Sequence, residues 1–119
     1  MERRRTYRVP WRKRISCNRL SGFREPLDAE TVDVSTLGVL LETTRPLSPG
    51  DRLELRLASE EPQLDVRTTG IVVRSAGRSP RGRFRSGVRF ARMAELARSE
   101  LGGFIAEQAL SSGEPLRAS

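Results

Sequence analysis

The stretch 52–57 reads Arg-Leu-Glu-Leu-Arg-Leu and constrains the fold more than any other part of the chain. Because side chains of a β-strand alternate between its two faces, this pattern places the leucines on one face and the charged groups on the other. Such a strand covers a core on one side and meets water on the other. The chain is therefore expected to fold around a sheet with one buried face.

Less regular versions of the same pattern predict five further strands. They cover roughly residues 9–17, 27–34, 39–43, 64–74 and 83–90. Turn-forming residues separate them, for example Ser21-Gly22 and Pro49-Gly50-Asp51, and a Gly-, Ser-, Pro- and Arg-rich stretch at 76–82 is expected to be a loop. Gly70 is expected to form a bulge that bends its strand.

The apolar pattern changes to helical spacing between Met93 and Gln108. Gly102-Gly103 weakens an isolated helix by about 1 kcal/mol per glycine, so this helix must dock on the strands. Unpaired edge strands of a small sheet promote aggregation, and closing the sheet into a barrel removes them. We predict an all-β fold, a six-stranded antiparallel β-barrel with a C-terminal α-helix. Residues 1–110 are expected to form one domain and residues 111–119 a disordered tail.

Composition argues against an enzyme and against a metal site. The chain has no histidine and a single cysteine, Cys17, so it lacks the commonest general base, a disulfide and a thiolate cluster. Both Cys17 and Trp11 share the apolar side of the first strand and are expected in the core. No catalytic residue, metal or cofactor is predicted. No apolar run approaches the ~20 residues of a membrane span, and no signal peptide is evident, so a cytoplasmic protein is expected.

The positive charge comes almost wholly from arginine. The net charge is +7, and Lys13 is the only lysine. Arginine offers a planar fork that matches phosphate and the edge of guanine. The composition points to an anionic partner such as a nucleotide, a nucleic acid or a membrane surface, although a genome of high GC content would also favour arginine codons.

Two segments carry candidate binding groups. The first, residues 3–8, reads Arg-Arg-Arg-Thr-Tyr-Arg and predicts a flexible anion clamp, with a solvated basic tail as the alternative. The second contains Asp33 and Ser35, which face the same side of a strand, followed by Gly38. Gly38 permits a close approach of ligand or a positive φ. The alternative is a side-chain-stabilised turn that needs no ligand.

Taken together, Arg4-x-x-x-Arg8 and, about 25 residues later, Asp33-x-Ser35-x-x-Gly38 resemble the two-part motif of the PilZ domain family, RxxxR followed by D/N-x-S-x-x-G. The stretch 87–90, Gly-Val-Arg-Phe, is similar to PilZ sequences as well. The resemblance covers roughly residues 2–108. It implies a PilZ-like barrel that binds the bacterial second messenger cyclic di-GMP.

The resemblance also implies which residues bind the ligand. They are Arg3, Arg4, Arg8, Asp33, Ser35 and Gly38. The two motif arginines would grip phosphate and guanine, Arg3 would reach a second stacked ligand, and the Asp33 segment would meet a guanine. Leu37 departs from the small or polar residue that many members carry there. Ordering of the arginine loop by ligand would pass the signal to a downstream protein partner.

Two other functions are kept open. One is a PilZ-like adaptor that works through protein contacts without ligand, although both halves of the motif are intact here. The other is a nucleic-acid-binding barrel, which suits the charge of +7 but lacks the interleaved aromatic residues expected for single-strand binding. Nucleic acid is therefore not the expected partner.

Overall fold

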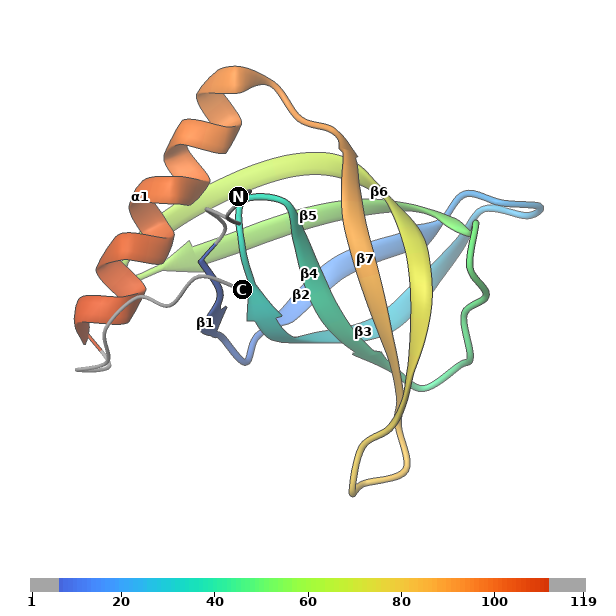
Figure 1. Ribbon diagram of the computed structural model, residues 1–119. Helices are drawn as coiled ribbons and strands as arrows, with labels where there is room; N and C mark the ends of the chain where they lie inside the picture. The colour runs from blue at the N-terminus through green and yellow to red at the C-terminus, as the bar shows by residue number, and fades with distance from the viewer. Residues whose placement is uncertain (1–6, 112–119) are drawn as a thin grey trace, which may run out of the picture.

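The computed structural model describes residues 7–111, which contain seven strands and one helix (Figure 1). The strands are β1 (Val9–Pro10), β2 (Arg14–Arg19), β3 (Glu25–Val34), β4 (Gly38–Thr43), β5 (Arg52–Glu60), β6 (Gln63–Arg78) and β7 (Phe84–Arg92), and the helix is α1 (Glu95–Ser111). Arg3, Arg4 and residues 112–119 of the expected tail lie outside this range, whereas Ser111, the first residue of that tail, is the last residue of α1. Within it, no helix is long and apolar enough to cross a membrane.

Six strands close into an antiparallel barrel. They follow the order β3-β2-β5-β6-β7-β4, and β4 pairs back with β3. The short strand β1 is added at the end of β3. Closure removes most of the exposed edge that so small an open sheet would have. The predicted six-stranded antiparallel barrel with a C-terminal helix is confirmed.

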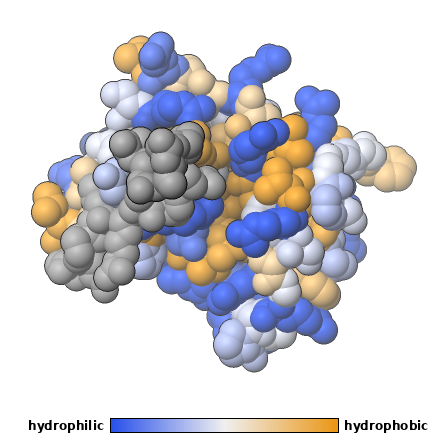
Figure 2. Space-filling model, viewed as in Figure 1, coloured by the Kyte–Doolittle hydropathy of each residue, from blue (hydrophilic) through white to orange (hydrophobic). Residues whose placement is uncertain are grey.

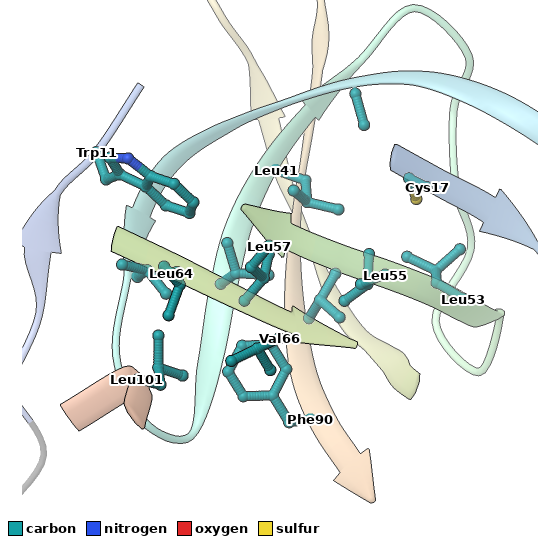
Figure 3. Close-up of a cluster of buried hydrophobic side chains, with 14 of the residues drawn as sticks. Trp11, Cys17, Leu41, Leu53, Leu55, Leu57, Leu64, Val66, Phe90 and Leu101 are labelled. Carbon is teal, nitrogen blue, oxygen red and sulfur yellow. The ribbon is translucent and has the colours of Figure 1, made fainter. Parts of the chain in front are cut away.

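The barrel interior is filled by the inward-facing apolar residues of its strands (Figure 3). Leu53, Leu55 and Leu57 are at most 1% exposed, as the alternation in 52–57 predicts. Cys17 is also in this core, and burial raises the pKa of its thiol to about 12. A thiol with so high a pKa is a poor nucleophile at neutral pH, which agrees with its prediction as a core residue.

Helix α1 packs against β6 and β1 and covers one side of the barrel (Figure 1). Leu101, Phe104 and Ile105 of α1 are buried against the barrel. Trp11 is 6% exposed and meets Phe104 edge to face, with ring centroids 5.0 Å apart and planes at 68°. This is a favourable aromatic geometry, and it ties the chain just after β1 to the helix.

The predicted single strand over residues 9–17 is wrong, because the structure divides it into β1 and β2. Residues 11–13 lie opposite only two residues of β3, so regular pairing is interrupted. The buried Thr31 hydroxyl compensates: it accepts the Lys13 N–H at 3.0 Å and donates to the Trp11 carbonyl. The side chain thus supplements the two backbone hydrogen bonds, Trp11 N–H to the Val32 carbonyl and Thr31 N–H to the Lys13 carbonyl, that still join the segments at this break.

Other boundaries differ less. Strand β6 continues to Arg78, into the stretch predicted as a loop, and the Arg78 guanidinium lies 4.3 Å from the centre of the Phe84 ring across the hairpin. The helix begins at Glu95 rather than Met93. The expected bulge is present at Gly70, where the β6–β7 register shifts.

Candidate ligand-binding site

Pairing of β1 with β3 brings the two halves of the motif together. Val9 pairs with Val34, and Pro10 with Asp33. Arg8 directly precedes this pairing, and its Nη1 donates to Asp33 Oδ1 at 2.5 Å. Both side chains remain partly exposed, at 38% and 28%. The last arginine of the N-terminal segment and the acidic residue of β3 therefore share one site.

A bulge in β3 determines which way Asp33 points. The register between β3 and β4 shifts between Thr31 and Asp33, so that Val32 is an extra residue. Ala29 and Thr31 are buried before the bulge, and Val34 is buried after it. Without the extra residue, Asp33 would share the inward face with Thr31. The bulge instead places the carboxylate on the outer wall of the barrel.

Ser35 closes the turn between β3 and β4. Its side chain is fully buried. The hydroxyl oxygen accepts the N–H of Leu37 at 3.1 Å and of Gly38 at 3.2 Å, and the Ser35 N–H donates to the Gly38 carbonyl at 2.9 Å. This is the side-chain-stabilised turn that the sequence left open as an alternative. Ser35 thus holds the shape of the loop that borders the site.

Gly38 is required by packing between strands. Its φ is not positive, so it does not serve as a left-handed residue. A Cβ on Gly38 would lie 2.3 Å from the Val88 carbonyl oxygen of β7. The absence of a side chain lets β4 approach β7 at the edge of the site.

Replacing Gly38 by alanine is therefore expected to lower the free energy of unfolding by about 1–3 kcal/mol, the usual effect of overpacking. Urea denaturation measures this. Gly103→Ala is the matched control, because nothing lies within 4 Å of its Cβ position and alanine favours the helix. A Gly38→Ala protein as stable as the wild type, yet deficient in ligand binding, would instead assign Gly38 to close approach of the ligand.

The helix holds this loop from its other side. Arg98 of α1 donates from Nη1 to the Thr36 carbonyl, in the middle of the 35–38 turn. A Cβ on Gly102 would lie 3.8 Å from the Thr36 methyl group, which is ordinary van der Waals contact. The loop is thus fixed both from within, by Ser35, and from the helix.

These elements border a pocket of ≈180 Å³ on the outer wall of the barrel. It is lined by Arg8, Ser35, Leu37, Gly38, Val73, Arg74, Gly87, Val88 and Arg89. A second hollow of ≈340 Å³, lined by residues 8–10 and 32–33, also borders Arg8. Figure 2 shows the same side of the molecule as Figure 1, with hydrophobic surface between protruding hydrophilic side chains. Arg8, Asp33, Ser35 and Gly38 are therefore neighbours, whereas Arg3 and Arg4 fall outside the described residues.

A larger hollow, of ≈590 Å³, lies between β2 and the β5–β6 hairpin. The arginines that line it are already paired, Arg14 with Asp28 at 3.0 Å and Arg56 with Asp65 at 2.9 Å. Both guanidinium groups of this hollow are thus already neutralised by carboxylates of the protein. The smaller pocket beside Arg8 offers the better site for an anion.

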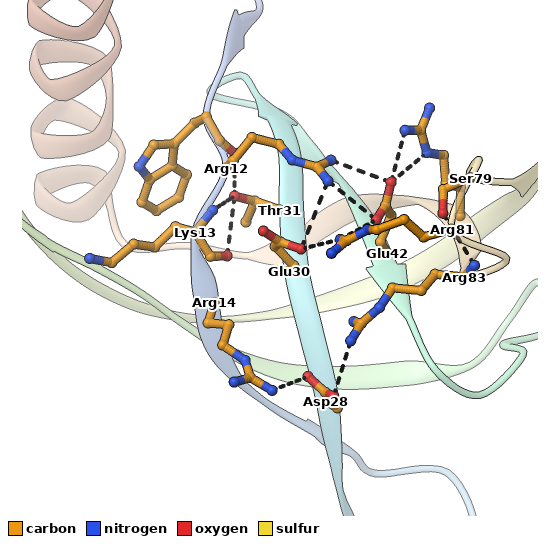
Figure 4. Close-up of polar contacts among 12 residues, drawn as sticks. Arg12, Lys13, Arg14, Asp28, Glu30, Thr31, Glu42, Ser79, Arg81 and Arg83 are labelled. Atoms are coloured by element: carbon orange, nitrogen blue, oxygen red, sulfur yellow. Dashed lines mark hydrogen bonds and ion pairs between the residues drawn. The ribbon is translucent and has the colours of Figure 1, made fainter.

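Another cluster of arginines surrounds Glu42, whose side chain is fully buried (Figure 4). Arg85 Nε donates to its Oε2 at 2.9 Å, Arg81 to its Oε1 at 3.2 Å, and Arg12 to both oxygens at 3.3 and 3.4 Å. Burial would raise the pKa of Glu42, but the three hydrogen-bonded guanidinium groups outweigh it and hold the pKa at about 2. These arginines stabilise the barrel and do not line the pocket.

Val73, Arg74 and Arg89 line the pocket but were not predicted from the sequence. The β6–β7 register shifts between Val72 and Arg74, so alternation alone misplaces the side chains that follow. The only sequence signal was the Gly-Val-Arg-Phe stretch at 87–90, which contains Arg89.

A closed barrel with an arginine-lined pocket on its wall is the architecture of a small binding domain. The PilZ domain family matches residues 2–107, and the chain belongs to this family. PilZ domains are non-catalytic receptor domains of cyclic di-GMP signalling, which confirms the prediction that the chain is not an enzyme.

The fold is shared with solved structures. The chain superposes on the Bacillus subtilis inhibitor of motility (MotI/DgrA) with a TM-score of 0.70 and 18% sequence identity. The match covers 93% of this chain and 53% of that one, so the present chain spans about half the length of that protein. No curated protein sequence matches the chain.

Proposed function

We propose that this PilZ domain binds cyclic di-GMP between its N-terminal arginines and the loop that joins β3 to β4. The observation that carries the proposal is the contact of Arg8 with Asp33 at 2.5 Å, beside an arginine-lined pocket. Cyclic di-GMP has two phosphates and two guanines. Guanidinium groups bind phosphate and the O6 and N7 acceptors of guanine, and a carboxylate accepts from the N1 and N2 donors on its other edge.

Each motif residue has a role in this proposal. Arg4 and Arg8 grip phosphate and guanine, and Arg3 reaches a second, stacked ligand molecule. Asp33 accepts from a guanine once Arg8 turns toward the ligand. Ser35 and Gly38 act on the ligand through the shape of the loop, since the Ser35 hydroxyl is engaged with the backbone.

The proposed signal is a change in the N-terminal arginine segment when the negatively charged ligand binds. Neutralising the clustered guanidinium groups removes their mutual repulsion and draws residues 2–8 against the barrel. A downstream protein partner in the cytoplasm then meets a changed surface. Amide hydrogen exchange with and without ligand tests this step, and residues 2–8 should exchange more slowly when ligand is bound.

Arg8→Ala is expected to weaken binding of cyclic di-GMP about tenfold to a hundredfold. The change removes a charge-assisted contact and leaves the Asp33 carboxylate unpaired next to a dianion. Isothermal titration calorimetry of the full chain measures the loss, and circular dichroism checks that the barrel is folded.

Arg67→Ala is the matched control, since Arg67 is exposed on β6 and lines no part of this pocket. It should bind within about threefold of the wild type, because a distant exposed charge contributes little. Absence of any binding heat from the wild-type chain at tens of micromolar protein would refute the proposed function.

A further inference from the structure

We propose that Arg74 and Arg89 form a second cationic half of this pocket, which binds the phosphate–guanine unit of cyclic di-GMP that Arg8 does not reach. Gly87 is then a positioning residue for Arg74. The inference rests on the proposed function and adds ligand-binding residues that lie outside both halves of the sequence motif.

The first support is that the guanidinium groups of Arg74 and Arg89 have no ion-pair partner within residues 7–111. Arginines elsewhere in the barrel are mostly used in ion pairs, as around Glu42. Arg74 and Arg89 both line the pocket, and neither makes a hydrogen bond or an ion pair through its side chain within residues 7–111. Cations that are left unpaired at the wall of a pocket are available to an anionic ligand.

The second support is the balance of charge. Arg8, Arg74 and Arg89 all line the pocket, and no acidic side chain in the described part of the chain does. Asp33 stands next to Arg8 and balances one of the three charges. The described part of the pocket therefore keeps a net positive charge, which suits a ligand with two negatively charged phosphates. Matching of this kind strengthens both the affinity and the rate of association.

The third support is the conformation of Arg74. The β6–β7 register shift makes Val73 an extra residue and pairs Arg74 with Gly87. A Cβ on Gly87 would lie 3.1, 3.2 and 3.3 Å from Cγ, Nε and Cζ of Arg74. The side chain therefore lies across Gly87, in space that any other residue would fill. Its guanidinium thus lies at the pocket wall, over the backbone of Gly87, where a ligand in the pocket can reach it.

The fourth support is the apolar border of the pocket. Leu37 and Val73 line it and are 46% and 47% exposed, so both offer apolar surface to a ligand. An apolar surface next to guanidinium groups suits a planar base, which packs its face on the former and hydrogen-bonds at its edge with the latter. A bare inorganic anion would make no use of these two side chains.

Calorimetric titration of the full chain with cyclic di-GMP tests the inference. Arg74→Ala and Arg89→Ala should each weaken binding about tenfold to a hundredfold. The matched controls are Arg67→Ala on β6 and Arg92→Ala on β7, which remove the same charge from the same strands outside the pocket and should stay within about threefold. Arg74→Lys should recover only part of the loss, because lysine lacks the paired donors of arginine.

Gly87 is tested by a double-mutant cycle. Gly87→Ala should weaken binding in the wild type but have no further effect in the Arg74→Ala background, because it acts only by displacing Arg74. A purely structural role of Gly87 would weaken both proteins equally. Thermal unfolding of each variant shows whether the barrel is intact.

The outcomes separate the two proposals. Wild-type binding that is lost in Arg8→Ala but unchanged in Arg74→Ala and Arg89→Ala would overturn this inference and leave the proposed function standing. No binding by the wild type would overturn both.

Discussion

Trp11→Ala is expected to lower the free energy of unfolding by about 3–5 kcal/mol, the usual cost of truncating a buried aromatic residue. Trp11 is 6% exposed and packs edge to face on Phe104 of α1. Its backbone N–H donates to the Val32 carbonyl at 3.0 Å, in the bulge that orients Asp33. Since the same residue follows β1, the change should also loosen the segment that carries Arg8 and weaken ligand binding.

Urea denaturation monitored by circular dichroism measures the loss of stability. Tryptophan fluorescence is unsuitable, because the alanine variant lacks the only tryptophan of the chain. Trp11→Phe is the control. It keeps an aromatic ring against Phe104 and should recover more than half of the loss. An alanine variant within about 1 kcal/mol of the wild type would show that α1 contributes little to the barrel.

The second large effect is expected at Glu42. Glu42→Gln keeps the shape of the side chain but removes the charge that meets Arg12, Arg81 and Arg85, and it should lower the free energy of unfolding by about 2–4 kcal/mol. Glu54→Gln is the matched control, because Glu54 is 45% exposed and meets Arg24 and Asn18 at the surface. It should cost less than about 1 kcal/mol.

The pH dependence of stability isolates the same group. The pKa of Glu42 is about 2 in the folded chain, against an ordinary value of 4.5. Because the folded pKa is the lower one, the contribution of Glu42 is complete above pH 4.5 and is lost as the pH falls toward 2. The difference in stability between the wild type and Glu42→Gln should therefore shrink across this interval. A difference that stays constant from pH 6 to pH 2 would contradict the assignment.

Much of the fold follows from local patterns in the sequence. Leu53, Leu55 and Leu57 alternate because β5 has one face in the core, and this pattern is independent of the rest of the chain. The break between β1 and β2 could not be predicted, because it depends on the Thr31 hydroxyl of another strand. Neither could the extension of β6, which involves a contact of Arg78 with Phe84 across the hairpin.

The site was predictable only in part, for a similar reason. The spacing of Arg8, Asp33, Ser35 and Gly38 identifies them as a set, and the structure brings them together. The physical role of each residue, however, depends on tertiary contacts with other strands. Gly38 is glycine because of the Val88 carbonyl, and Arg74 reaches the pocket through a register shift. The alternation of side chains along one strand does not reveal which residues of the adjacent strand lie opposite Gly38 or Arg74.

The bond from Arg98 to the Thr36 carbonyl joins the binding loop to the helix, and it has a consequence for regulation. Movement of the 35–38 loop or of α1 breaks or strains the Arg98–Thr36 hydrogen bond. The free energy of each loop position therefore depends on where the helix lies. Thermodynamic linkage is reciprocal. With cyclic di-GMP bound at this loop as proposed, a protein that captured α1 and drew it off the barrel would change nucleotide affinity by the same factor by which bound nucleotide changes the capture.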